Sequence, residues 1–179
     1  NKSDVIFVGR LLSHKNVDLL VKATAIVKQS IPEIRCKIIG DGPEKLNIEE
    51  IIEKLELSDN VQILDNIKSD TEKYALMKAS KMFVFPSIRE GFGLVVVEAN
   101  AAGLPVITTN HEDNASKDLI NEGVNGFLVD PDENSIAEKI LQVLKTRDSM
   151  EPRMQISRYD WQTVVQNVRN SYKTNHSLI

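Results

Sequence analysis

Two hydrophobic periods alternate along the chain. Short runs rich in β-branched residues are nearly continuous in apolar character, which is typical of strands covered on both faces. Longer stretches between them carry apolar residues at helical spacing. The pattern predicts strands at residues 5–9, 36–40, 61–65, 82–86, 105–109 and 126–129, and helices at residues 17–27, 44–57, 71–78, 93–102, 136–144 and about 160–173.

Strands that alternate with helices through short loops indicate βαβ units. We therefore predict an α/β fold, a doubly wound, Rossmann-like parallel sheet of about six strands with helices on both faces. The 179 residues suit one domain, residues 1–179, with a core at about 4–147 and the last helix beyond it. Ligands of such sheets bind beyond the carboxyl ends of the strands, so functional residues are expected directly after each strand.

Composition narrows the classes of ligand. The chain has 22 Lys and Arg against 26 Asp and Glu, a formal net charge of -4, so no general surface for nucleic acid is implied and any anion site must be local. The one cysteine, Cys36, excludes an internal disulfide framework and a multi-cysteine zinc site, and we expect it to be buried in a strand. No signal peptide is visible, and no apolar run approaches the roughly 20 residues of a transmembrane helix.

The loop after the first strand, GRLLSHKN, carries a candidate anion site. It lacks the GxGxxG pattern, so a nicotinamide dehydrogenase is not expected. Arg10 and Lys15 follow Gly9 and flank a short loop that opens a helix. A guanidinium, an ammonium and free helix N–H groups together suit a diphosphate. The alternative is a pair of solvated surface cations, and His14 between them is interpreted as a loop residue.

A Gly-bearing loop and an apolar stretch follow the fourth strand. Residues 94–97 have strand propensity, and a seventh strand is the alternative, but Ala99, Ala101 and Ala102 favour a helix over 93–102. That helix would be apolar nearly all round and hence buried, with Glu98 as the exception. Such a carboxylate is either paired to a cation or available to ligand hydroxyls.

Glu90 precedes Glu98 by eight residues. At the helical rise of about 1.5 Å per residue, the two carboxylates are expected on the order of 8–12 Å apart. That separation fits two hydroxyl-bearing groups of one ligand, with an anion between them at the helix N-terminus. A nucleotide sugar has this layout, and a Glu salt-bridged to Lys or Arg is the structural alternative.

Two further loops give weaker signals. GDGP at residues 40–43 is typical of a strand-to-helix connection. After the fifth strand, Asp113 or Asn114 is expected to cap a helix at residues 116–120. His111 and Glu112 are adjacent in sequence and cannot both face one ion on a helix, so no metal site is predicted.

These segments together resemble a known family. VGRLLSHKN, GDGP, PSIREGFGLVVVEANAAGLPVIT and NGFLVDPDE follow the order found in the family-4 retaining glycosyltransferases (glycosyl transferases group 1). The resemblance covers about residues 4–147 and centres on a Glu-x7-Glu pattern, Glu90 and Glu98. It implies the C-terminal, donor-binding half of a GT-B fold. The implied activity is transfer of a hexose from a nucleoside-diphosphate sugar to an acceptor hydroxyl, with retention of anomeric configuration.

The resemblance also implies roles for individual residues. Arg10 and Lys15 would hold the donor diphosphate and stabilise it as it leaves, and Glu90 would contact sugar hydroxyls; these three are the implied catalytic residues. Glu98 would accept hydrogen bonds from the ribose hydroxyls, and the end of the third strand would meet the base. The implied donor site, with no cofactor and no metal, comprises Gly9, Arg10, Lys15, Ile63, Leu64, Glu90, Gly91, Phe92, Gly93, Leu94 and Glu98.

Two departures from the family pattern are visible. HEDNASKDLI follows the fifth strand where the family often has a Gly-Gly turn before a Glu, which leaves the selectivity for the hexose open. Asp65-Asn66 follows the third strand where a glycine is common, which leaves the base contact open.

The acceptor-binding N-terminal domain of such enzymes is absent from these residues. The chain begins at Asn1 without Met, and we interpret it as a domain of a longer protein. We expect a nucleotide sugar and that N-terminal domain as partners, a cytoplasmic location with any contact to the inner face of the membrane made by the other half, and little transfer by this chain alone. Trp161 is expected to be a packing anchor. Two alternatives stay open, a GT-B-like sugar-nucleotide epimerase and a non-catalytic nucleotide-sugar-binding or scaffold module.

Overall fold

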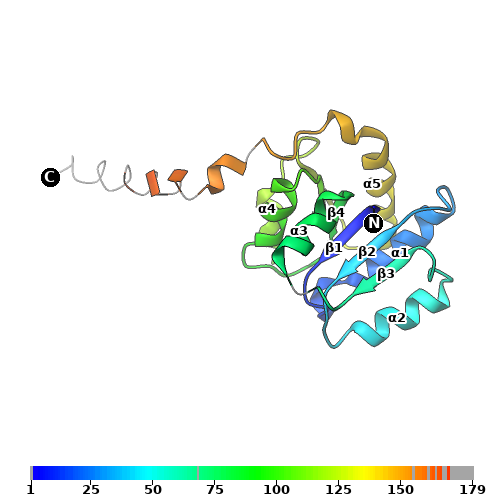
Figure 1. Cartoon of the computed structure of the whole chain (residues 1–179). Coiled ribbons are helices and arrows are strands. Elements are labelled where there is room, and N and C mark those ends of the chain that lie inside the picture. Colours follow the sequence, from blue (N-terminus) through cyan, green and yellow to red (C-terminus); the bar gives the residue numbers. More distant parts are fainter. Residues whose placement is uncertain are drawn as a thin grey trace.

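The structure is a computed structural model that describes residues 2–67, 69–154, 156–160, 162, 163, 165, 166 and 169. Within these residues, six parallel strands form one sheet (Figure 1). They are β1 (Ser3–Val8), β2 (Cys36–Ile39), β3 (Val61–Leu64), β4 (Ser80–Phe85), β5 (Val106–Thr109) and β6 (Gly126–Val129). Their order is β3-β2-β1-β4-β5-β6, so the winding reverses between β1 and β4. Ligands of doubly wound sheets bind beside such a reversal, the topological switch point.

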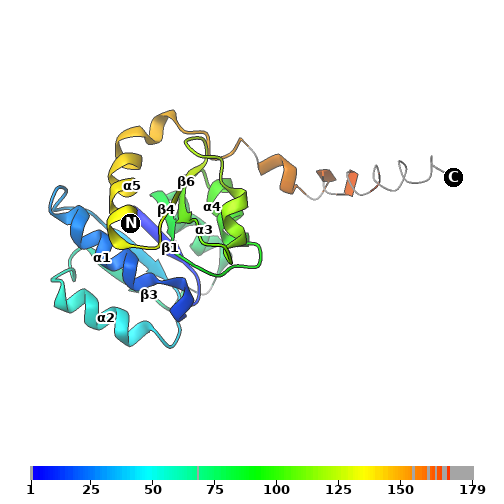
Figure 2. The ribbon, with the colours of Figure 1, turned by 180° about the vertical axis from the view of Figure 1, so that it is seen from behind.

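Helices cover both faces of the sheet, as predicted (Figures 1 and 2). α1 (Val17–Lys28), α2 (Lys45–Lys54) and α5 (Glu133–Thr146) lie on one face, where α1 contacts both of the others. α3 (Asp70–Lys78) and α4 (Leu94–Ala101) lie on the other face. The described residues also form the short 3-10 helices η1 (Ser13–Lys15), η2 (Ala115–Leu119), η3 (Arg147–Ser149) and η4 (Ile156–Tyr159).

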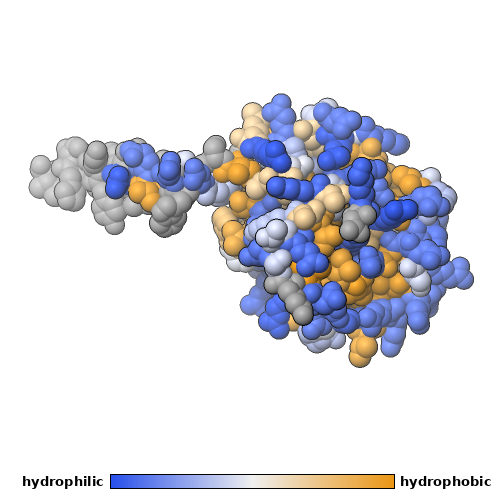
Figure 3. Space-filling view, viewed as in Figure 1, coloured by the Kyte–Doolittle hydropathy of each residue, from blue (hydrophilic) through white to orange (hydrophobic). Residues whose placement is uncertain are grey.

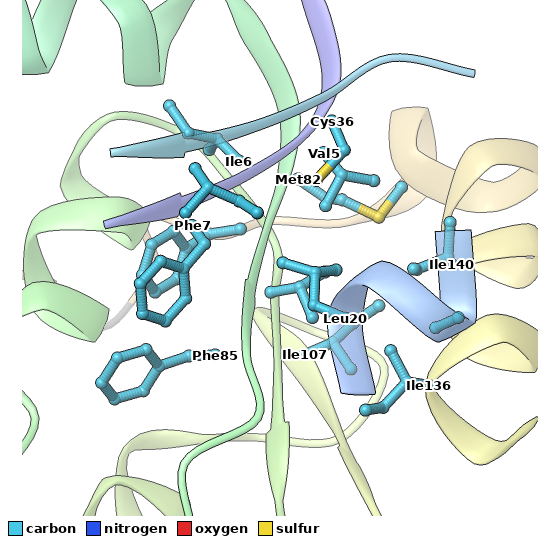
Figure 4. Close-up of a cluster of buried hydrophobic side chains, with 14 of the residues drawn as sticks. Val5, Ile6, Phe7, Leu20, Cys36, Met82, Phe85, Ile107, Ile136 and Ile140 are labelled. Atoms are coloured by element: carbon cyan, nitrogen blue, oxygen red, sulfur yellow. The ribbon is translucent and has the colours of Figure 1, made fainter. Parts of the chain in front are cut away.

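Buried side chains hold the helices on the sheet (Figure 4). Phe7 of β1 stacks on Phe85 of β4 with ring centroids 5.8 Å apart, and Phe83 stacks on Phe85 at 5.6 Å. Leu20 of α1 meets side chains of α5 in the same core. Cys36 is buried in β2, as predicted. Phe85 ends its strand at the switch point, so this aromatic cluster forms the floor beneath the carboxyl edge of β1 and β4.

The surface in Figure 3 is mostly hydrophilic. A hydrophobic area lies over the strands between α2 and α3, where no helix covers the sheet in this view. The side chains of Ile63 and Leu64, at the carboxyl end of β3, are half-buried. They therefore belong to the edge of the hydrophobic core.

The structure corrects two expectations about single elements. Residues 94–97 lie in α4, so the alternative of a seventh strand is wrong. The expectation that this helix is buried all round is also wrong, because Leu94 is 64% exposed while Val96 and Ala99 are buried. The helix predicted at 116–120 is the short η2. The last predicted helix falls largely outside the described residues, and Trp161 lies outside them altogether.

A close approach of two loops shapes the carboxyl edge. A Cβ atom on Gly40, directly after β2, would lie 1.9 Å from the carbonyl oxygen of Gly9. The Gly9 N–H donates to the carbonyl of Ile39 and the Gly40 N–H to that of Leu64, each at 3.0 Å. The GDGP turn therefore packs the loop after β2 against the loop after β1.

Candidate functional site

A groove of about 340 Å³ opens at the carboxyl edge, beside the switch point. The ends of β1 and β4 contribute one wall and the start of α4 contributes the other. Larger hollows of about 480 and 430 Å³ lie at the amino edge, away from the end where parallel sheets bind ligands. The candidate groove is lined by Val8, Gly9, Lys15, Phe85, Glu90, Gly93, Leu94, Val95 and Glu98.

Lys15 and Glu90 form an ion pair inside this groove. Their side chains are 14% and 13% exposed, and the Lys15 ammonium also lies 4.9 Å from the centre of the Phe85 ring. Backbone contacts bring the two loops together: the carbonyl of His14 accepts from the Ile88 N–H at 3.0 Å and from the Ser87 hydroxyl at 3.2 Å. Two residues that lie 75 positions apart thus share one partly desolvated site.

The backbone of Glu90 is held by the segment after β5. Its N–H donates to the carbonyl of Asp113, and its carbonyl accepts from the Ala115 N–H, both at 3.0 Å. Between them, buried Asn114 donates to the Thr109 carbonyl at 2.8 Å and accepts from Ser116, both from its N–H at 3.2 Å and from its hydroxyl at 2.6 Å. The predicted cap at Asn114 is therefore confirmed, but sequence reasoning missed that this residue also anchors the Glu90 loop.

The N-terminus of α4 faces the groove. Gly93 is the N-cap in the left-handed conformation, φ 85°, and a Cβ atom there would lie 2.4 Å from that of Ser116. The first N–H groups of a helix have no i−4 partner within it. The Val96 N–H donates to the Gly93 carbonyl at 2.8 Å, which leaves the N–H groups of Leu94 and Val95 for an anion. Phe92 and Leu94 beside them are 48% and 64% exposed, which leaves this end of the helix open to a ligand.

Glu98 of α4 lies at the other end of the groove and is tied to α3. The Tyr74 hydroxyl donates to Oε1 at 2.9 Å, and the Lys73 ammonium lies 3.4 Å from Oε1 and 3.3 Å from Oε2. Lys73 also contacts Asp70 at 3.1 Å. The carboxylate is therefore paired to a cation, which was one of the two predicted states, and it still lines the groove.

The ionisation of the Glu98 partners follows from these contacts. Burial disfavours the charged form of Lys73, but hydrogen bonds to Asp70 and Glu98 outweigh burial and raise its pKa. The pKa of Tyr74 is also raised, first because its hydroxyl donates to the Glu98 carboxylate and second because of burial. Lys73 stays charged and Tyr74 stays protonated near neutral pH, so both act as donors toward Glu98.

Other residues of the predicted donor site lie outside the groove. Arg10 is exposed, and its side chain has no hydrogen-bond or ion-pair partner among the described residues. Gly91 has open space around its Cβ direction. Ile63 and Leu64 lie in β3, away from the groove lining. The structure thus brings Gly9, Lys15, Glu90, Gly93, Leu94 and Glu98 together and leaves the others on the rim or beyond it.

Sequence reasoning missed an ion pair at the end of β3. Lys45, the first residue of α2, pairs with Asp65, one of the two residues that depart from the family pattern. The contact lowers the pKa of Asp65 and raises that of Lys45. The two residues are 20 positions apart in sequence, and only the fold brings them together. The one sequence feature that could have indicated the pair is a lysine shortly after the GDGP turn.

The described residues hold neither a cluster of metal ligands nor a membrane-spanning helix. No three His, Cys, Asp or Glu side chains within them gather as a metal ion would need. No helix in the described part of the chain is both long and apolar enough to cross a membrane.

Fold and groove together define the class: a doubly wound α/β domain with an anion-suited ligand groove at its switch point. The sequence matches the model of the family glycosyl transferases group 1 over residues 1–161. The chain belongs to this family. The predicted resemblance to the glycosyl transferases group 1 and the predicted fold, that of the C-terminal domain of GT-B glycosyltransferases, are confirmed.

Known proteins similar to the chain agree with this assignment. Sulfoquinovosyl transferase SQD2 of Arabidopsis thaliana is 33% identical over 177 residues, covering 93% of this chain and 32% of that protein. The structure of Anabaena HepE in complex with UDP and glucose superposes with a TM-score of 0.81 at 25% identity, covering 97% of this chain and 49% of that one. The chain therefore spans less than half the length of these two relatives.

A third similar structure is itself a domain. The C-terminal domain of the group 1 glycosyl transferase LpcC from Francisella tularensis has a TM-score of 0.73 at 24% identity, and the match covers 92% of this chain and 85% of that one. At this identity the match shows the fold alone. The fold shared with this domain extends over nearly all of its length.

Proposed function

We propose that the chain is the donor-binding domain of a glycosyltransferase and holds a nucleoside-diphosphate sugar in the groove beside the switch point. The observation that carries this proposal is the gathering of Lys15, Glu90, the N-terminus of α4 and Glu98 along one groove. Lys15 and the N-terminus of α4 suit a diphosphate, Glu90 suits a sugar and Glu98 suits a ribose. HepE, which has a similar fold, was solved in complex with UDP and glucose, and this supports a ligand of the same class for this chain.

Each group has a role that its chemistry suits. Lys15, exposed Arg10 and the α4 N-terminus would stabilise the negative charge that develops on the departing diphosphate, the main electrostatic term in such a reaction. Glu90 would accept hydrogen bonds from sugar hydroxyls while it keeps its contact with Lys15, because a carboxylate has several acceptor sites. Glu98 would accept from the ribose hydroxyls, and Ile63 and Leu64 would lie near the base.

The family resemblance supports a more specific proposal for the reaction. We propose hexosyl transfer with retention of configuration and without a metal or cofactor, since two cations and a helix terminus are available to the diphosphate. The acceptor would be bound by a second domain. Because the chain spans about a third of SQD2 and about half of HepE, we expect it to bind donor but to transfer little sugar alone.

Calorimetry on the full chain tests the proposal. UDP-glucose, GDP-glucose and ADP-glucose are titrated, each beside its free diphosphate. We expect one nucleotide to bind, and Glu98→Ala to weaken it by about 10-fold or more, because hydrogen bonds to a charged group contribute roughly 1.5–3 kcal/mol. Leu46→Ala, at a 72% exposed site on α2, is the matched control and should bind like wild type.

The two informative failures are distinct. If none of the nucleotides binds, the donor-binding proposal is wrong and a scaffold role is favoured. If a nucleotide binds equally well to Glu98→Ala, the chain binds nucleotides but the ribose role of Glu98 is wrong. Rapid transfer to an added acceptor by the chain alone would contradict the need for a second domain.

A further inference from the structure

The segment that follows α5 returns along α4. It leaves η3, and the Glu151 N–H donates to the Val124 carbonyl at 2.9 Å, which anchors the segment beside β6. Local turns then lead to η4, which contacts α4. Figures 1 and 2 both show the chain passing the outer side of α4 here. We call the described residues of this stretch, 150–154 and 156–159, the strap.

The strap contacts the C-terminal end of α4 through Arg153. The guanidinium donates from Nε to the Ala101 carbonyl at 3.1 Å and from Nη2 to the Ala102 carbonyl at 3.4 Å. The last carbonyls of a helix lack partners within it, and a cation is favourable there. Arg153 therefore caps α4 from outside the helix.

The strap contacts the opposite end of α4 through Tyr159. Its ring meets that of Phe92 edge-to-face, with centroids 6.0 Å apart and an interplanar angle of 74°. Phe92 precedes the N-cap of α4 by one residue and lies in the same loop as Glu90. The strap thus contacts both ends of α4. Arg153 lies 52 residues after Ala101, and Tyr159 lies 67 residues after Phe92.

The N-terminal end of α4, near the contact between Phe92 and Tyr159, is also a wall of the candidate groove. The loop at residues 90–93 is fixed at Glu90 by the segment after β5 and at Gly93 by contact with Ser116. Between these points Gly91 has open space in its Cβ direction, so the ring contact of Phe92 with Tyr159 supports the outer side of the loop. A shift of that ring would move the N-terminus of α4 and the carboxylate of Glu90 relative to each other.

We propose that Arg153 and Tyr159 are positioning residues for donor binding: the strap holds α4 and the 90–93 loop in the arrangement that the donor requires. Neither residue lines the groove, so both act through the elements that they contact. The inference rests on the proposed function, since it assumes that the groove binds a nucleotide sugar.

The test compares variants of the strap by calorimetry with UDP-glucose and UDP, or with the GDP or ADP pair if that pair binds better. Tyr159→Ala should weaken sugar-nucleotide binding by about 2- to 10-fold, the range of an aromatic pair. Binding of the free diphosphate should change less, because Arg10 and Lys15 lie on the loop after β1, which the strap does not hold, whereas the sugar depends on the position of Glu90. Tyr159→Phe keeps the ring and should retain the affinity. Met154→Ala, on the same strap at a 63% exposed site, is the matched control.

A double variant separates positioning from general loss of fold. If the two rings act together, adding Phe92→Ala to Tyr159→Ala should weaken binding no further than the stronger single variant does. Arg153→Gln should also weaken the sugar nucleotide more than the diphosphate. Equal affinities of wild type and Tyr159→Ala would overturn this inference alone, as would equal losses for sugar nucleotide and diphosphate. Absence of binding by wild type would overturn the proposed function and this inference with it.

Discussion

The Tyr74 hydroxyl donates a 2.9 Å hydrogen bond to Oε1 of Glu98, joining α3 to the one acidic residue of α4. Lys73 reaches both oxygens of the same carboxylate from the adjacent position. The carboxylate is thus fixed in orientation before any ligand arrives. A fixed acceptor binds a diol with less loss of side-chain entropy than a mobile one.

The first prediction concerns this orientation. Tyr74→Phe removes one donor from Glu98 and should weaken nucleotide-sugar binding by about 3- to 10-fold, the range of a single hydrogen bond to a charged group. The loss should be smaller for the 2′-deoxy form of the same nucleotide, which already lacks a ribose contact. Calorimetry with both nucleotides measures the difference. Glu72→Gln, an exposed change on α3, is the control, and equal losses for both nucleotides would contradict the role of Tyr74.

The second prediction separates the two members of the groove ion pair. Glu90→Gln leaves Lys15 in place without its charged partner. The free diphosphate should bind within about twofold of wild type or tighter, because Lys15 no longer shares its charge. The sugar nucleotide should bind about 10-fold or more weakly, because a charged acceptor for sugar hydroxyls is lost. Calorimetry with both ligands tests this split, and a parallel loss for both would place Glu90 at the diphosphate instead.

The third prediction uses two neighbouring glycines with different surroundings. Gly93→Ala forces a side chain into the left-handed conformation and toward Ser116, and should lower the free energy of unfolding by about 1–3 kcal/mol. Gly91→Ala enters open space and should leave stability within about 0.5 kcal/mol of wild type. Urea denaturation of the three proteins gives both values. Equal midpoints for wild type and Gly93→Ala would show that the loop relaxes without strain.

The fourth prediction concerns Cys36. Burial in β2 raises the pKa of this thiol to about 12. Only the thiolate reacts with disulfide reagents, and at pH 8 its fraction in the folded chain is on the order of one in ten thousand. Cys36 should therefore react with such a reagent only when the chain opens, and at full rate in denaturant. Rapid labelling of the folded chain at pH 8 would contradict the burial of this strand.

The sequence alone predicts the order of strands and helices well, because each element carries its own hydrophobic period. It also selects Lys15, Glu90 and Glu98, which all line the groove, because each lies in a loop after a strand or interrupts an apolar helix. The partners of Glu98 escape such reasoning. In the sequence, Tyr74 belongs to the apolar positions of a predicted helix. Its hydroxyl reaches the Glu98 carboxylate only because the fold places α3 beside α4.

The sequence also gives a wrong expectation for the burial of α4, for a related reason. Its residues are apolar nearly all round, but only the flank with Val96 and Ala99 meets the sheet. Leu94 instead borders the groove at the helix N-terminus. The residue types of a helix determine how apolar it is, but its exposure depends on the elements that pack against it. The roles of the strap and of Lys45 likewise depend on contacts between distant segments.

The last prediction concerns Asn114, within the segment that departs from the family pattern. Its buried amide joins the end of β5 to Ser116 and lies beside the backbone bridge to Glu90. Asn114→Ala leaves the Thr109 carbonyl without the amide donor and should lower the free energy of unfolding by about 1–3 kcal/mol. It should also weaken the sugar nucleotide more than the free diphosphate, because the segment whose backbone holds Glu90 loses its side-chain hydrogen bonds to Thr109 and Ser116. Glu112→Ala, exposed in the same segment, is the control. Urea denaturation and calorimetry on both variants measure these effects, and a loss of stability with unchanged selectivity would confine Asn114 to a structural role.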